Sequence, residues 1–322
     1  MRRIVLFYIS LSLILTLFGI GITDRTLGES VDTAKVFDDR VYLLVGVDKA
    51  SYNADVMMLV RLYEGGLSVL QIPRDSLTSE GKRLNTVFAA ACLRAKRRGA
   101  DDKEAFSEGG TLLAEQLGEV FGVRVAAHAT LTLSAFSKLI DTVGGVDVTL
   151  ERALSYHDPE QGLTISLPAG EQHLDGAAAE GLVRCRNAYP DADYGRMRAQ
   201  RKLIASLFHK LKHEFSPLAL VSLFRAAYGE VETDLAFKDA LVLLRELSSS
   251  DGSLAFATLV GRTVKVGKAP LEALAEKNLT KAADYLGGKL NEDAARRMFL
   301  YPSSETGKIY EESSPPPFTV SE

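Results

Sequence analysis

The pattern of apolar and polar positions predicts a chain of mixed strands and helices. Nearly continuous apolar runs at 41–47, 55–62 and 67–72 predict strands buried on both faces, as in a sheet covered by helices on either side. Further strands are expected at 126–131, 146–150, 163–167 and 254–260. Apolar residues at helical spacing predict helices at 84–98, 111–121, 134–143, 175–181, 218–228, 235–247, 271–286 and 291–299. We therefore expect the α/β class, an α-β-α layered sheet with helices on both faces.

A longer apolar run stands at the N-terminus and bears on the cellular compartment. The segment from Ile4 to Thr23 carries no charge and follows Arg2 and Arg3. As a helix it would be about 30 Å long, enough to cross the hydrocarbon core of a bilayer. No Ala-x-Ala cleavage pattern follows, and the two arginines favour a cytoplasmic N-terminus. We expect a single-pass protein of the cell membrane, with a cytoplasmic tail at 1–3, an uncleaved signal anchor at 4–23 and an extracytoplasmic remainder.

Changes in composition divide that remainder into parts. We expect a polar stalk at 24–40, a catalytic domain at 41–213, a helical or mixed extension at 214–300 and an irregular or disordered tail at 301–322. The net charge of −4 argues against a general nucleic-acid-binding protein, which would carry a basic excess. Neither Cys92 nor Cys185 belongs to a metal-binding motif, and two buried free thiols are favoured over a disulfide.

The densest set of candidate functional residues lies at 182–200, in the stretch LVRCRNAYPDADYGRMRAQ. If residues 182–186 are extended, Arg184 and Arg186 point to the same side. Asp193 is a good candidate for the start of a helix, and Arg196 and Gln200 would then fall on the apolar face of that helix. Arg196 needs an anion, because an unpaired charge in a protein interior costs on the order of several kcal/mol.

The anion that Arg196 needs is either an internal carboxylate or a ligand. Structural salt bridges to Asp191 and Asp193 are one interpretation. The two arginines just upstream make a single internal carboxylate an incomplete answer, because each of them also needs a partner. The whole stretch therefore favours a site for a phosphate group.

Other charged residues stand at the ends of the predicted strands, where α/β folds place their ligands. Asp48 ends the first strand and Asp55 opens the second, and further candidates are Arg74, Asp75 and Arg83. Carboxylates bind Mg²⁺, which bridges to phosphate oxygens, and arginines bind those oxygens in pairs. The chain shows no glycine-rich P-loop and no histidine close in sequence to a serine or cysteine nucleophile. We expect a metal-assisted phosphoryl transfer in which a hydroxyl group attacks directly.

Seven motifs follow one another over residues 41–211: GVD, ADVMML, IPRDS, RLN, LIDTVGGVDV, AGEQHLDGAAAEGLVRCR and DYGRMRAQ. In this order, and behind an N-terminal membrane anchor, they resemble the extracytoplasmic LytR-CpsA-Psr (LCP) family. The resemblance implies an enzyme that moves a glycopolymer, such as wall teichoic acid or capsule, from a polyprenyl-pyrophosphate carrier to peptidoglycan. It implies the 6-hydroxyl of N-acetylmuramic acid as the acceptor, and Mg²⁺, with Mn²⁺ as an alternative, on the pyrophosphate.

The resemblance assigns a role to each candidate residue, motif by motif. Asp48 and Asp55 match the metal-linked aspartates. The positions that would bind the pyrophosphate are Arg74, Arg83 (where lysine is commoner), Arg184, Arg186, Arg196 and Gln200. The residues expected to act in catalysis are Arg74, Asp75, Asp193 and Arg196. Of these, Asp193 would orient the arginines or help to deprotonate the acceptor.

Two departures from the family pattern bear on metal affinity and phosphate binding. The loop between Asp48 and Asp55 is short, and Ala54 replaces a polar or basic neighbour. Ala199 stands where a second arginine often precedes the glutamine, and Arg198 falls on the opposite helical face.

Three functions stay open at this point: the phosphotransferase, a lipid-pyrophosphate hydrolase that uses water as the acceptor, and a non-catalytic envelope protein that binds polyprenyl-phosphate precursors. The implied partners are the lipid-linked glycopolymer, peptidoglycan and the membrane through the N-terminal helix, with no nucleic acid. The apolar helix faces at 88–93 and 136–140 would serve equally as a polyprenyl pocket or as ordinary core.

Overall fold

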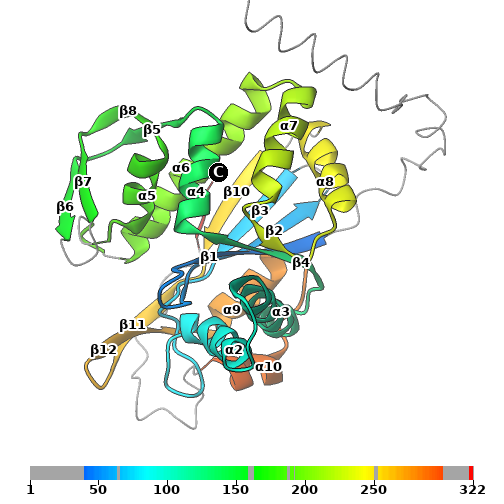
Figure 1. The fold of residues 1–322 in the computed structure, drawn as a ribbon. Coiled ribbons are helices and arrows are strands. Elements are labelled where there is room, and N and C mark those ends of the chain that lie inside the picture. Colours follow the sequence, from blue (N-terminus) through cyan, green and yellow to red (C-terminus); the bar gives the residue numbers. More distant parts are fainter. Residues whose placement is uncertain are drawn as a thin grey trace, which may run out of the picture. The chain divides into compact units, whose positions relative to one another are not determined.

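A seven-stranded sheet forms the centre of the fold, in the order β13-β10-β3-β2-β1-β4-β9 (Figure 1). Its strands are β1 (Arg40–Val47), β2 (Ala54–Tyr63), β3 (Gly66–Gln71), β4 (Val125–Thr132), β9 (Glu232–Thr233), β10 (Ser253–Thr258) and β13 (Thr319–Ser321). β1, β2 and β3 form an antiparallel meander, as their apolar runs and the turn signal at 64–66 predict. β4 lies parallel to β1, and β10 parallel to β3.

The computed structural model describes residues 40–63, 66–158, 163–186, 189–191, 193–249, 253–299 and 319–321. They belong to one unit that extends over residues 39–322. The predicted cytoplasmic tail at 1–3, the signal anchor at 4–23 and all of the stalk except Arg40 lie outside the described residues. Within the described ranges, no helix combines the length and the apolarity needed to cross a bilayer.

One face of the sheet is covered by four helices, α2 (Asn85–Arg97), α3 (Asp102–Phe121), α9 (Glu276–Tyr285) and α10 (Glu292–Met298) (Figure 1). Because side chains alternate along a strand, every second residue of β1 from Val41 to Val47 points toward these helices. These residues form the main core with the fully buried Phe88, Leu117 and Phe121. Burial of apolar surface, at about 25 cal/mol per Å², is the main force that holds the two layers together.

The opposite face is covered by α6 (Asp193–Glu214) and α8 (Phe237–Ser249), with α7 (Pro217–Tyr228) beside α8 (Figure 1). Tyr42 of β1 packs in a cluster with Phe208 of α6, and Met58 of β2 packs in a cluster with Ile204 of α6. Both faces of the sheet are therefore covered by helices. The predicted α-β-α class is confirmed.

A second hydrophobic core lies between α6 and a small subdomain. The elements of that subdomain are α4 (Leu133–Thr142), β5 (Val146–Leu150), β6 (Leu154–Asp158), β7 (Leu163–Leu167), β8 (Gly170–Leu174) and α5 (Gly176–Arg184). Val148, Leu182 and Leu203 are buried together in this core. This packing fixes the end of α5 next to the beginning of α6, so it positions the arginine-rich segment.

The extension predicted at 214–300 is not a separate addition to a catalytic domain. β10 is a strand of the central sheet, and α9 and α10 contribute Leu279, Ala282 and Met298 to the main core. The prediction of an irregular tail at 301–322 is wrong at 319–321, where β13 pairs with β10. The rest of that tail lies outside the described residues.

Three local predictions also need correction. The helix expected at 111–121 begins earlier, at Asp102, behind a capping box formed by Asp101 and Glu104. The helix expected at 271–286 is interrupted, because β12 (Ala269–Leu274) pairs with β11 (Gly261–Val266) and α9 starts only at Glu276. The extended segment expected at 182–186 is wrong, since residues 182–184 form the last turn of α5. Cys92 and Cys185 are buried thiols and not a disulfide, as predicted.

Candidate functional site

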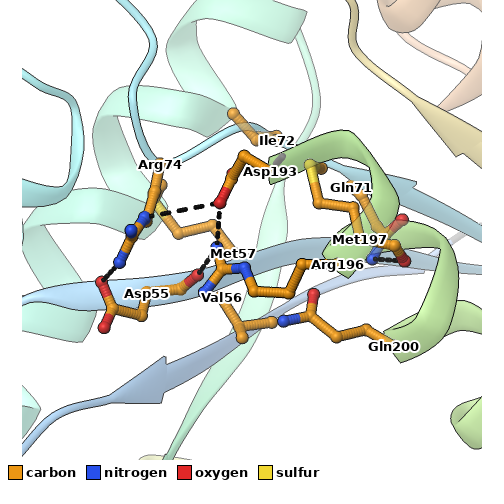
Figure 2. A pocket seen from close by; sticks show the side chains of 10 residues that line it. All are labelled: Asp55, Val56, Met57, Gln71, Ile72, Arg74, Asp193, Arg196, Met197 and Gln200. Atoms are coloured by element: carbon orange, nitrogen blue, oxygen red, sulfur yellow. Dashed lines mark hydrogen bonds and ion pairs between the residues drawn. The ribbon is translucent and has the colours of Figure 1, made fainter. Parts of the chain in front are cut away.

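The site lies where the start of β2, the loop after β3 and the first turn of α6 meet (Figure 2). A β-bulge shapes the start of β2, because Gly46 pairs with Val56 but Val47 pairs with Ala54, which leaves Asp55 as the extra residue. Bulges next to active sites redirect a side chain in this way. The Asp55 carboxylate accepts a hydrogen bond from Arg74 Nη1 at 2.6 Å.

Arg74 stands in a tight loop directly after β3. The loop closes with a hydrogen bond from Ser76 N to Pro73 O at 3.1 Å, and Asn85 N donates to Arg74 O at 3.1 Å. The guanidinium of Arg74 is mostly buried. Burial alone would lower its pKa, but the surrounding carboxylates, Asp55 first, raise the pKa above its ordinary value. Arg74 therefore stays fully charged in a setting where anions surround it.

Arg196 is 5% exposed, on the apolar face of α6 where the helical spacing predicts it. Its Nη2 lies 2.9 Å from Asp193 Oδ1 and donates to the backbone oxygen of Asp55 at 3.1 Å (Figure 2). Burial lowers the pKa of Arg196, and the Asp193 carboxylate opposes that shift. Arg196 Nε is buried without a hydrogen-bond partner among the described residues, and neither Asp193 oxygen has an aligned donor there.

A third carboxylate, Asp75, connects the remaining arginines of the site. Asp75 is buried, with Arg83 Nε 2.9 Å from its Oδ1 and Arg186 Nη2 3.6 Å from its Oδ2. Arg186 Nε also lies 3.9 Å from Asp193 Oδ1, and Arg74 Nε lies 3.7 Å from the same atom. Arg74, Arg83, Arg186 and Arg196 thus form one ion-pair network with Asp55, Asp75 and Asp193.

The structural salt bridges considered for this segment are also present. Arg196 pairs with Asp193, and Arg198 pairs with Asp191 on the solvent side of α6. Arg198 therefore does not contact the network, as its helical position predicts. The Asp193 pair does not use all of the polar groups of Arg196, because Nε remains buried and without a partner in the described part of the chain. A buried donor of this kind costs stability unless a ligand or water satisfies it.

Three predicted site residues make other local interactions. The Asp48 carboxylate accepts from Ala50 N at 3.0 Å and from Ser51 Oγ at 2.9 Å, so it caps its own turn. Arg184 pairs with Glu180 at 3.0 Å within α5. Gln200 lines the pocket beside Arg196 (Figure 2). Its Nε2 donates to Val183 O at 3.1 Å and so joins α6 to α5.

Across the described residues, no three His, Cys, Asp or Glu side chains are grouped as a metal site. Mg²⁺ does not require such a group, since it keeps several waters and takes one or two carboxylates together with substrate phosphate oxygens. Asp48 follows β1 and Asp55 lies in the bulge of the paired strand β2, so two hard oxygen donors stand at adjoining strand ends. This donor set fits Mg²⁺ that arrives together with a phosphate ligand.

Two residues at the site were not predicted from the sequence. Tyr194 follows Asp193 in α6, and its hydroxyl group donates to Glu272 Oε2 at 3.1 Å. Glu272 belongs to β12, in a segment that the spacing of Leu271, Leu274 and Leu279 assigns to a helix. The turn glycine Gly267, with a φ of 63°, was the available signal for a hairpin.

The two helix faces considered as a lipid pocket serve largely as core. Phe88 and Cys92 are fully buried in the main core and Ile140 in the second core, whereas Leu93 is 42% exposed. Leu44, in the middle of β1, is 41% exposed. The pairing register places Val56 of β2 and Leu131 of β4 on the same face of the sheet as Leu44. The exposed Leu44 and the half-buried Val56 and Leu131 therefore form an apolar surface on the sheet face that α6 covers in part.

Comparison with known proteins identifies the chain's relatives. The cell wall biosynthesis protein LcpA of Corynebacterium glutamicum is 26% identical over 69% of this chain and 46% of its own length. The polyisoprenyl-teichoic acid–peptidoglycan teichoic acid transferase TagU of Enterococcus faecalis is 26% identical over 60% of this chain and 63% of its own length. The chain thus spans roughly half to two thirds of these relatives.

Solved structures share the fold. TagV of Bacillus subtilis superposes with a TM-score of 0.58 at 19% identity, over 77% of this chain and 96% of that structure. TagT bound to LI-WTA superposes with a TM-score of 0.57 at 22% identity, over 79% of this chain and 91% of that structure. The sequence model of the LytR_cpsA_psr family matches residues 23–283, which include every residue of the ion-pair network. The chain belongs to the LytR_cpsA_psr family.

Proposed function

We propose that the protein is a phosphotransferase that moves a glycopolymer from a polyprenyl-pyrophosphate carrier to the 6-hydroxyl of N-acetylmuramic acid in peptidoglycan. The observation that carries this proposal is the ion-pair network, in which the buried Arg196 keeps a donor that is unsatisfied among the described residues. A relative of this chain, TagU of Bacillus subtilis, is named as a teichoic acid transferase to peptidoglycan. That name suggests the class of substrate that we propose for this chain.

In the proposed reaction, the arginines bind the pyrophosphate. Arg74 and Arg196 approach Asp55 and Asp193 from opposite sides, and a phosphate oxygen between them would replace part of those ion pairs (Figure 2). Arg83 and Arg186 are held by the buried Asp75, which keeps their guanidinium groups in place. Preorganised charge of this kind stabilises the negative charge that develops during phosphoryl transfer.

Asp193 is the carboxylate best placed to take the proton of the acceptor hydroxyl. Neither of its oxygens has an aligned hydrogen-bond donor among the described residues, and the three arginines that pair with it all come closest to Oδ1. At Asp75, by contrast, arginines approach both oxygens. The hydroxyl oxygen attacks the phosphorus that carries the glycopolymer, and the bond from that phosphorus to the bridging oxygen breaks. Polyprenyl phosphate leaves, a phosphodiester joins polymer to peptidoglycan, and Asp193 holds the proton.

We further propose that Mg²⁺ binds with the substrate, at Asp55 and Asp48. The network pairs its arginines with nearly as many carboxylates, so the free site has little excess positive charge for a pyrophosphate. A bound Mg²⁺ supplies that charge and neutralises phosphate oxygens. Asp55 would have to exchange its hydrogen bond to Arg74 for the metal, which leaves Arg74 to bind the phosphate.

The apolar surface around Leu44 is our candidate for contact with the polyprenyl chain. It lies on the β1–β2 part of the sheet, and β2 begins at the site. In this proposal the segment at 4–23 anchors the protein in the cell membrane, with the site on the extracytoplasmic side. A membrane-bound substrate and an anchored enzyme would then meet at the same surface.

The experiment uses the full-length chain in detergent with a labelled polyprenyl-pyrophosphate oligosaccharide and peptidoglycan fragments, with Mg²⁺ or with a chelator. We expect label to become attached to peptidoglycan, with one polyprenyl phosphate released for each attachment, only when Mg²⁺ is present. Release of phosphorylated oligosaccharide without attachment would instead show a hydrolase. Tight binding of the lipid without turnover under either condition would show a non-catalytic binding protein.

A further inference from the structure

We propose that Glu272, on the C-terminal hairpin β11–β12, is a positioning residue that holds the two halves of the phosphate site in register. One half is the loop after β3 with Arg74 and Asp75, and the other is the first turn of α6 with Asp193 and Arg196. The inference rests on the proposed phosphate site and adds a residue that acts on it from the C-terminal part of the chain.

The backbone of Glu272 is joined to the first half. Its amide donates to Asp75 O at 2.9 Å, and its carbonyl accepts from Leu77 N at 2.8 Å. These two bonds extend β12 alongside the loop as a parallel bridge at Ser76. The side chains reinforce the contact, because the fully buried Leu77 packs against Leu271 in a small apolar cluster. The hairpin is therefore fixed to the loop that carries Arg74 and Asp75.

The side chain of Glu272 is joined to the second half. Its Oε2 accepts from the hydroxyl group of Tyr194 at 3.1 Å, and its Oε1 accepts from Thr263 Oγ1 at 2.7 Å. The same Tyr194 hydroxyl accepts from Gly261 N at 3.1 Å, so both strands of the hairpin hold the tyrosine. Tyr194 lies between Asp193 and the turn that carries Arg196, and its position sets the position of both.

One residue thus touches both halves, with its backbone on one and its carboxylate on the other. This location disfavours the charged form of Glu272. Burial raises the pKa of its carboxyl group, and the nearby Asp75 and Asp193 raise it further. A partly buried carboxylate beside two others is unfavourable for folding alone. The hydrogen bonds from Thr263 and Tyr194 oppose that effect.

The test measures the affinity of the full-length chain for inorganic pyrophosphate with Mg²⁺, by calorimetry in detergent. The variants are Glu272→Ala, Tyr194→Phe, both together, and the conservative Glu272→Gln, which still accepts the tyrosine hydroxyl. Glu276→Gln, an exposed carboxylate at the start of α9, is the matched control. Loss of the Tyr194–Glu272 bond should weaken binding about two- to tenfold, the range expected for one hydrogen bond.

We expect Glu272→Ala and Tyr194→Phe to weaken binding to a similar extent, the double variant to be no weaker than the weaker single variant, and Glu272→Gln to restore affinity. Such non-additivity is the signature of one shared interaction. Unchanged affinity in Tyr194→Phe, or full additivity in the double variant, would overturn the inference. Should Glu272→Ala not fold, Tyr194→Phe and Glu272→Gln still decide the question. If the protein binds pyrophosphate but does not transfer polymer, the proposed function is contradicted. The role of Glu272 at the phosphate site is then still supported by the binding data.

Discussion

At the scale of the residue, Arg196 is the site residue whose burial the helical spacing of the sequence predicts. Its place on the apolar face of α6 follows from the spacing of Arg196, Gln200 and Leu203, and the structure buries it there. A buried guanidinium must be paired, because an unpaired buried charge is strongly destabilising. This energetic cost is the reason for predicting an anion beside Arg196. The internal partner is Asp193, and the unsatisfied Nε is the feature that the sequence alone does not reveal.

Replacement of Arg196 by methionine should weaken pyrophosphate binding while the fold is kept. Methionine fills a similar volume on the apolar face, and Asp193 still has Arg74 and Arg186 within 4 Å. Loss of charge-assisted hydrogen bonds should weaken affinity about 10- to 150-fold. Arg198→Met, on the solvent side of the same helix, is the control and should change affinity little. Equal losses in calorimetric titrations of the two variants would argue against Arg196 as a ligand.

The raised pKa of Glu272 makes a prediction about stability and pH. A carboxyl group whose pKa is higher in the folded state contributes stability that is present below its ordinary pKa, 4.5, and lost as the pH rises through the folded-state value. Glu272→Gln cannot ionise, so its melting temperature relative to wild type should rise between pH 4 and neutral pH. Thermal melts over that range test this. A difference between the two proteins that does not change with pH would contradict it.

The sequence predicts only some of the residues that meet at the site. The others form hydrogen bonds or ion pairs with residues close to them in the sequence. Arg74, Asp75, Arg83 and Arg186 converge because each stands at the end of an element that reaches the same edge of the fold. Asp48 and Arg184 were expected there too, but short-range partners engage them, a turn for Asp48 and Glu180 for Arg184. Asp48 would therefore reach the proposed Mg²⁺ only by giving up the hydrogen bonds of its turn. Such local hydrogen bonds compete with distant ones and are invisible in a motif.

At the scale of the element, long apolar runs predict β1, β2 and β3 well because both faces of those strands are buried. β12 is different. Leu271, Leu274 and Leu279 have helical spacing, yet residues 269–274 pair with β11 and fix the loop after β3. Pairing with a distant strand decides such short segments, and periodicity alone does not contain that information.

Close packing at the start of α6 gives a further prediction. A Cβ atom on Gly195 would lie 2.2 Å from Tyr189 Cβ, so the segment before α6 would have to move. Gly195→Ala should therefore destabilise the protein by about 1–3 kcal/mol, even though alanine favours helices. Gly229→Ala, after α7, meets open space at a helical φ and is the control. A thermal melt in which Gly195→Ala is as stable as wild type would show that the segment adapts freely.

At the scale of the whole molecule, the site is built by parts of the chain that are far apart. The loop at 73–77, the first turn of α6 and the hairpin β11–β12 meet at one place. Residues after 214 also complete the central sheet and the main core through β10, α9 and α10. The division into a catalytic domain and an extension, which composition suggests, is therefore not a division of the fold.

A chain that ends at Glu214 should not fold. It would leave β3 without its neighbour β10 and remove Leu274, Leu279 and Phe299 from the main core. Lost burial of this size exceeds the roughly 5–15 kcal/mol by which native proteins are stable. We expect no cooperative transition in thermal unfolding, whereas a chain that ends at Leu300 should keep one. A soluble, cooperatively melting 1–214 fragment would show that the C-terminal part is dispensable.

The central claim is that the arginine and aspartate network performs phosphoryl transfer from a lipid carrier. The most direct measurement is the rate at which labelled oligosaccharide passes from polyprenyl pyrophosphate to peptidoglycan in the presence of Mg²⁺. It compares the wild type, Arg74→Ala and the control Arg98→Ala, whose exposed arginine pairs with Glu108. We predict transfer by the wild type and the control, and loss of at least about a hundredfold in Arg74→Ala, as for removal of a preorganised transition-state contact. Equal rates in all three proteins would contradict the account.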